Sequence, residues 1–136
     1  MKLFISGPMR GIPYYGFPAF DAAKAAFKAA GFDVVTPADL DRAIGFDAMA
    51  LPADTDWNAE GGFDIRAAIK RNIDALLDAD GVVFLEGWGG SLGCNIERLI
   101  ADRLNMRLDM QRGRTLPVFV QVVQKYWTGC ARKGEA

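Results

Sequence analysis

Glu97 follows Ser91 and Gly93 at a spacing that can bring a carboxylate to the edge of a ligand-binding loop. The glycine-rich residues 87–93 precede an expected helix, whose free amide groups favour phosphate or carboxylate. Glu97 lies in the first turns of that helix, so we expect the amides to favour its ionised form. Such a carboxylate can attack an anomeric carbon. A glutamate at this position is also explained by ordinary helix capping.

A second glycine-containing loop, residues 7–11, follows the first expected strand. Gly7 and Gly11 allow a ligand to approach the backbone, and Arg10 can reach an anion. Neither this loop nor residues 87–93 matches a Walker motif or a G-x-G-x-x-G fingerprint. Each loop taken alone is therefore also explained as a tight turn.

Asn72 is spaced so as to lie on or beside the inward face of another expected helix. An inward amide needs hydrogen-bonding partners. The sequence leaves open whether backbone groups or a ligand supply them. Asp80 is expected to be a turn or capping residue. Five aromatic residues in or near loops can stack on a base or pack locally: Tyr14, Tyr15, Phe17, Trp57 and Trp88.

The composition restricts the remaining chemistry. The 136 residues include no histidine, which excludes Ser/His/Asp and Cys/His machinery and the usual zinc sites. We therefore expect no metal and no cofactor. The net charge of −1 argues against polymeric nucleic acid as a partner. Cys94 and Cys130 are far apart, and the chain carries no signal-peptide pattern or membrane-length apolar run, so we expect a cytoplasmic protein with no membrane partner.

The elements that must position these residues alternate along the chain. Hydrophobic periodicity predicts helices and strands in the order βαβαβαββ. The expected strands are 2–6, 33–36, 81–85, 106–110 and 116–123, and the expected helices are 17–30, 64–78 and 95–104. The length of 116–123 also fits a helix. This order predicts one α/β domain over residues 1–136, with a mostly parallel sheet and helices on both faces.

Two segments stand outside this alternation. Residues 38–63 form a long acidic connection, which is either a solvated excursion or a lid or subunit contact. Residues 126–136 are expected to be a flexible tail.

Ligands of open parallel sheets bind at the carboxyl ends of the strands, where both glycine-containing loops lie.

Four motifs of the chain are distinctive in combination, namely Ile5-Ser6-Gly7-Pro8-Met9-Arg10-Gly11, Phe17-Pro18-Ala19-Phe20, Ala79-Asp80-Gly81-Val82-Val83 and Gly87-Trp88-x-x-Ser91-x-Gly93-x-x-x-Glu97. Together they resemble the motifs of the nucleoside 2-deoxyribosyltransferase superfamily, especially its small phage and bacterial domains of the DUF4406 type. The resemblance covers residues 2 to about 110. The Ser-Leu-Gly-x-x-x-Glu element is also similar to that of the deoxynucleoside 5'-monophosphate N-glycosidases.

This resemblance implies a flavodoxin-like domain that cleaves or transfers the N-glycosidic bond of a nucleoside or its 5'-monophosphate. It implies Glu97 as nucleophile, a homodimer or larger homo-oligomer, and no cofactor. The alternative is a non-catalytic nucleotide-binding module of the same fold. The substrate-binding residues that it implies are Ser6, Gly7, Met9, Arg10, Gly11, Phe17, Trp88, Ser91 and Gly93.

Two residues depart from the pattern of that superfamily. Asn72 stands where its enzymes carry an aspartate, and an amide can bind a ligand but cannot protonate a leaving base. Arg98 and Leu99 follow Glu97, where the superfamily often has Leu-Gly. Arg98 can crowd the site or supply a further phosphate contact.

Overall fold

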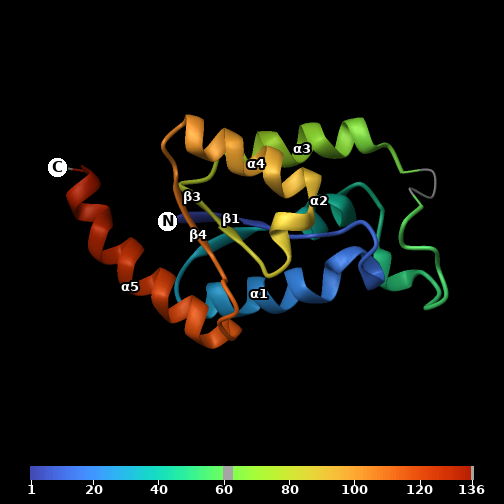
Figure 1. Cartoon of the computed structure of the whole chain (residues 1–136), viewed down its shortest axis with the longest axis horizontal. Coiled ribbons are helices and arrows are strands. Elements are labelled where there is room, and N and C mark those ends of the chain that lie inside the picture. The colour runs from blue at the N-terminus through green and yellow to red at the C-terminus, as the bar shows by residue number, and fades with distance from the viewer. Residues whose placement is uncertain (60–62, 136) are drawn as a thin grey trace.

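The computed structural model describes residues 1–59 and 63–135, with side chains as far as Trp127. Four parallel strands form one sheet in the order β2-β1-β3-β4 (Figure 1). The strands are β1 Lys2–Ser6, β2 Asp33–Val35, β3 Gly81–Phe84 and β4 Arg107–Met110. The helices are α1 Phe17–Ala29, α2 Pro37–Ala43, α3 Ile65–Leu77, α4 Leu92–Arg103 and α5 Leu116–Glu135. Short 3-10 turns occupy Pro13–Gly16, Ala48–Ala50 and Trp88–Gly90. The chain is a single flavodoxin-like α/β domain, as the sequence predicts.

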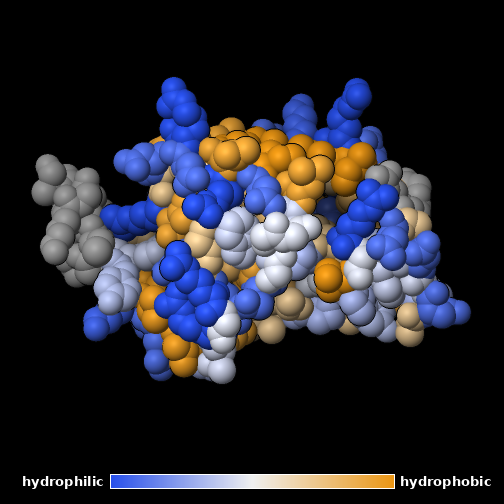
Figure 2. All heavy atoms as spheres, viewed as in Figure 1, coloured by the Kyte–Doolittle hydropathy of each residue, from blue (hydrophilic) through white to orange (hydrophobic). Residues whose placement is uncertain are grey.

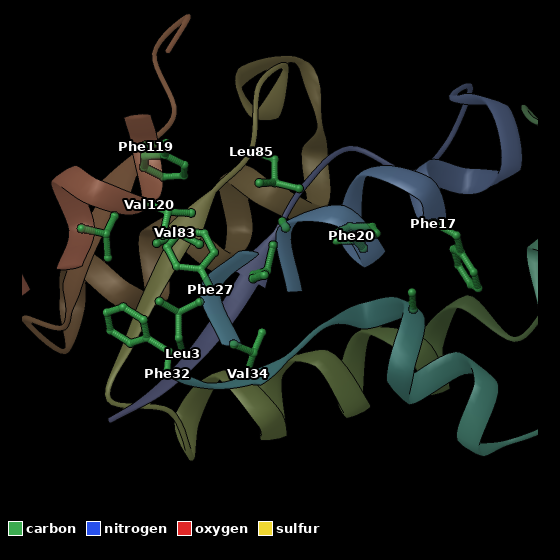
Figure 3. Packing of buried hydrophobic residues seen from close by; sticks show 14 of the residues in the cluster. Leu3, Phe17, Phe20, Phe27, Phe32, Val34, Val83, Leu85, Phe119 and Val120 are labelled. Atoms are coloured by element: carbon green, nitrogen blue, oxygen red, sulfur yellow. The ribbon is translucent and has the colours of Figure 1, made fainter. Parts of the chain in front are cut away.

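Helices cover both faces of the sheet because β1 and β3 are apolar on both sides. Leu3 and Ile5 of β1 face α1 and α5, where phenylalanines of those helices complete one core (Figure 3). Phe4 faces α3 and α4, in a second core with Val82 and Phe84 of β3. Ser6 follows Phe4 by two residues and lies on the same face, because side chains alternate along a strand. The polar end of β1 therefore meets α4.

Residues 116–123 are the one predicted strand that the structure corrects, since they begin helix α5. The buried side chains of α5, as far as Trp127, are Phe119, Val120, Val123 and Trp127, whose spacing of three and four residues is helical. The backbone of α5 continues to Glu135, through the segment for which the sequence predicts a flexible tail. Trp127 belongs to the core beside Phe32, Phe27 and Phe119.

The long connection contains a helix that its composition did not reveal. Thr36 and Asp39 form a reciprocal capping box at the start of α2, and Pro37 occupies its first position. The later part of the connection is bound to the loop after β1. The Gly11 amide donates to the Trp57 carbonyl oxygen at 2.9 Å, and the Tyr15 hydroxyl donates to the carbonyl of Ala59.

Aromatic packing adds to these hydrogen bonds. The Trp57 ring lies 4.9 Å from the Tyr14 ring and 5.2 Å from the Tyr15 ring, measured between centroids. Residues 57–59 of the long connection therefore pack on the β1–α1 loop. Across the described residues, no helix is both long enough and apolar enough to span a membrane.

Candidate active site

Glu97 lies where α4 crosses the carboxyl end of β1. The Ser6 hydroxyl donates to Glu97 Oε1 at 2.9 Å, which joins two groups that are 91 residues apart in the chain. Glu97 is only 8% exposed, and its second oxygen, Oε2, has no hydrogen-bond partner. A buried polar atom without a partner is rare and costly. One carboxylate oxygen is therefore positioned by the fold, and the other is available to a ligand.

Glu97 lines a small pocket of about 40 Å³ between α3 and α4. Asn72 of α3 lines the same pocket, and its buried Oδ1 also lacks a partner. Gly93 lies on the α4 side, where an added Cβ would have only Ser91 Oγ near it, at 4.0 Å. Isoleucines complete the lining, namely Ile69, Ile73 and Ile96. The structure thus brings together four candidate residues that the sequence analysis named, Ser6, Asn72, Gly93 and Glu97.

Burial raises the pKa of Glu97 from 4.5 to about 7, and the hydrogen bond from Ser6 opposes this increase. This finding corrects the expectation that helix amides keep Glu97 ionised. Glu97 is the sixth residue of α4, whereas the free amides belong to the first turn. The acid is therefore a group that gains or loses its proton near neutral pH, which suits both a nucleophile and a general acid.

Ser91 has a structural role at the start of α4. Its hydroxyl accepts a hydrogen bond from the Cys94 amide at 3.3 Å and caps the helix. The Asn95 side chain holds the preceding loop, because its Nδ2 donates to the carbonyl oxygens of Gly89 and Ser91. Cys94 is buried beside Ser6, and burial raises the pKa of its thiol. These contacts fix the position from which α4 presents Glu97.

The loop after β1 contacts the long connection and does not line the pocket of Glu97. Arg10 Nε donates to the Asn58 carbonyl oxygen at 2.9 Å. Met9 packs against the α1 and α5 core. Gly7 is needed for close packing, because an added Cβ would lie 3.1 Å from the Phe20 ring. Gly11 has a φ of 79°, a left-handed conformation that glycine adopts without strain.

Three further predicted residues take part in local packing. Phe17 is completely buried, with its ring edge-on to Phe46, and so forms part of the core. Trp88 packs on Phe84 at 5.3 Å between ring centroids. The Arg98 guanidinium lies over the Trp88 ring, 5.3 Å from its centroid. Asp80 accepts a hydrogen bond from the Lys2 amide at 2.6 Å, which is the structural role expected of it.

Sequence reasoning missed the isoleucines that line the pocket of Glu97, because isoleucines at helical spacing predict a buried core stripe.

Sequence reasoning also missed a second pocket of about 290 Å³ on the opposite face of the sheet, beside α1 and the start of α5. Glu86 and Gln111 line that pocket, but they bind neighbouring backbone: the Glu86 amide donates to Gln111 Oε1, and the Gly113 amide donates to Glu86 Oε2. Of these two pockets of the described residues, that of Glu97 alone has unpartnered buried polar atoms among its lining residues.

The fold and site define a flavodoxin-like domain with a buried acid at the carboxyl edge of its sheet. Residues 1–110 match the family described as Domain of unknown function (DUF4406), and the chain belongs to this family. The match ends at Met110, the last residue of β4, so α5 lies outside it. Comparisons with curated proteins and with solved structures found no match.

Proposed function

We propose that this chain cleaves or transfers the N-glycosidic bond of a nucleoside or its 5'-monophosphate, with Glu97 as the nucleophile. The observation that carries the proposal is the carboxylate itself: Ser6 holds one oxygen at 2.9 Å, and the other is unpartnered in a pocket shared with Asn72. The motifs of the chain support assigning this DUF4406 domain to the nucleoside 2-deoxyribosyltransferase superfamily, which they resemble.

In this proposal Glu97 Oε2 attacks C1' of the sugar as the bond from C1' to the base nitrogen breaks. The electron pair of that bond leaves with the base, which takes a proton from water. The glycosyl ester on Glu97 is then cleaved by water, or the sugar passes to a second base. Asn72 accepts a hydrogen bond from the substrate but supplies no proton, because an amide is not an acid in this range. Glu97 must be ionised to attack, so the first step is faster above pH 7 than below it.

The substrate needs more room than the pocket of about 40 Å³ provides. The pocket accommodates only the reacting edge of the sugar, and the base and phosphate must contact surfaces beyond it. A homo-oligomer, which the superfamily resemblance implies, supplies such surfaces. We therefore include self-association in the proposal.

Release of free base from a panel of nucleosides and 5'-monophosphates tests the chemistry. We expect wild type to release base and Glu97→Gln to lose the activity on the order of a thousandfold or more, as loss of a nucleophile does elsewhere. Glu86→Gln is the matched control, since Glu86 lies exposed at the same edge of the sheet. Equal rates in wild type and Glu97→Gln would contradict the proposal.

A second candidate is a nucleotide-binding module without turnover, and Asn72 is the observation that favours it. With an amide at that position, the pocket is lined by a single acid, Glu97. The module predicts that nucleotides raise the melting temperature with no base release, because a ligand that binds only the native state stabilises it. Base release that depends on Glu97 excludes this candidate.

A further inference from the structure

The outward surface of α3 carries an apolar stripe that nothing in the described chain covers. Ile65, Ile69 and Leu77 recur at four- and eight-residue intervals and are 48%, 41% and 51% exposed. On the adjacent helix α4, Leu92 and Leu99 are 78% and 68% exposed. Figure 2 shows hydrophobic residues gathered over α3 and α4, with charged side chains projecting beside them. A contiguous patch of this kind marks an interaction surface.

A charged stripe runs beside the apolar one along α3. Arg66, Lys70, Asp74 and Asp78 are spaced by four residues and are all exposed. None of the four forms an ion pair with another described residue. The positive charges lie in the amino-terminal half of the helix and the negative charges in the carboxyl-terminal half. This order is the reverse of the one that the helix dipole stabilises, so helix stability does not explain it.

The charges along α3 are complementary to those of a second α3 that runs antiparallel to it. When a second α3 is laid antiparallel and centred on Asn72, Arg66 faces the partner's Asp78, and Lys70 faces the partner's Asp74. The two-fold operation repeats both pairs, which is the property of an isologous interface. The isoleucine and leucine stripes of the two copies meet beside the charges, and the antiparallel helix dipoles attract each other.

We propose that a second copy of this chain packs antiparallel against the outward face of α3, with the two-fold axis crossing the helix at the level of Asn72. The 13 residues of α3 extend over about 20 Å, so this pairing covers the apolar stripe along its whole length. Ile69 and Ile73 belong both to this surface and to the wall of the pocket that holds Glu97. The second copy therefore lies next to that pocket and offers further surface beside it.

Charge-swap variants test the pairing. Arg66→Glu/Lys70→Glu places four negative charges along α3, and Asp74→Lys/Asp78→Lys places four positive ones. Attraction then becomes repulsion in each self-pair, and we expect the dissociation constant of each homodimer to rise on the order of a hundredfold. An equimolar mixture of the two variants restores the pairing, because each then faces the opposite charge. Sedimentation equilibrium measures the association, and circular dichroism checks that these exposed substitutions leave the fold intact.

The matched control is Lys28→Glu/Lys125→Glu, which changes the net charge equally at exposed positions on α1 and α5. It should associate as wild type does. A wild-type chain that remains monomeric at its highest soluble concentration would overturn the proposal. So would charge-swap variants that associate like the control, or a mixture that stays monomeric. The pairing depends on the α3 surface alone. Base release without association would contradict the pairing and leave the chemistry standing. Association without base release would contradict the chemistry and leave the pairing standing.

Discussion

At the scale of single residues, the site depends on how Glu97 is held. Its environment is apolar except for Ser6 and Asn72, so the neutral form is favoured in the empty site. A sugar that develops positive charge at C1' would favour the ionised form and lower the pKa of the acid. The same burial that weakens Glu97 as an anion therefore strengthens its interaction with a cationic transition state.

The raised pKa of Glu97 also makes a prediction about stability. Between pH 4.5 and about 7 the native state holds a proton that the unfolded chain has already lost. The free energy of unfolding therefore falls as the pH rises through this range and changes no further above it. At about 1.4 kcal/mol per pKa unit, the loss amounts to roughly 3 kcal/mol.

Glu97→Gln removes this titration. We expect its stability relative to wild type to improve by roughly 2.5 kcal/mol between about pH 5 and about pH 8, the part of the titration that this range covers, measured by urea unfolding. Asp41, whose pKa burial raises to about 6, contributes equally to both proteins and cancels. Glu86→Gln should follow wild type at both pH values. An unchanged difference between Glu97→Gln and wild type would show that Glu97 titrates normally.

At the scale of elements, α5 contacts the sheet where Trp127 lies against Gly81. A Cβ added to Gly81, the first residue of β3, would lie 2.6 and 2.7 Å from ring carbons of Trp127 and 2.9 Å from the Arg107 carbonyl oxygen. Real side chains do not tolerate such distances, so the ring and with it α5 must move. The glycine is thus required by packing and not by backbone conformation.

Gly81→Ala should therefore destabilise the chain by about 1–3 kcal/mol, the usual cost of overpacking a core. Urea unfolding measures the loss, and near-ultraviolet circular dichroism reports the altered packing of Trp127. Gly89→Ala is the control, because an added Cβ there meets nothing within 4 Å. If the two substitutions cost the same, α5 does not pack on β3 as described.

At the scale of the whole molecule, contacts distant in sequence hold the loops around the sheet edge. The long connection reaches back to the β1–α1 loop, with Trp57 between Tyr14 and Tyr15 and its carbonyl bonded to the Gly11 amide. In Figure 1 this connection lies at the end of the molecule away from the two chain termini. The long connection thereby fixes the β1–α1 loop, which contains Arg10.

Trp57→Ala should loosen this attachment. We expect amide hydrogen exchange at Gly11 to accelerate about tenfold or more, because without the Trp57 ring the loop opens at a lower free-energy cost. Exchange in β1 should stay unchanged. Trp88→Ala is the control, since Trp88 packs on Phe84 at the other face of the sheet. Exchange at Gly11 that is the same in Trp57→Ala and wild type would show that the ring does not hold the loop.

The sequence by itself determined the alternation of elements, the parallel sheet and the short list containing Glu97, Ser6, Asn72 and Gly93. The alternation and the sheet follow from local periodicity, and Glu97, Asn72 and Gly93 follow from their spacing and from the rule that strand ends gather at one edge. Ser6 was named only because its motif resembles that of the superfamily. Sequence reasoning misjudged residues 116–123, because a short apolar run fits a strand or a helix until its partners are known.

Only the tertiary structure decided what the candidate residues do. Ser91 caps a helix, Phe17 fills the core, and Arg10 binds the Asn58 carbonyl. Ser6 and Glu97 meet across 91 residues, and burial, which depends on all the surrounding elements, sets the pKa of the acid to about 7. Residue types and spacing nominate an acid, but desolvation and hydrogen bonding by distant segments determine its chemistry.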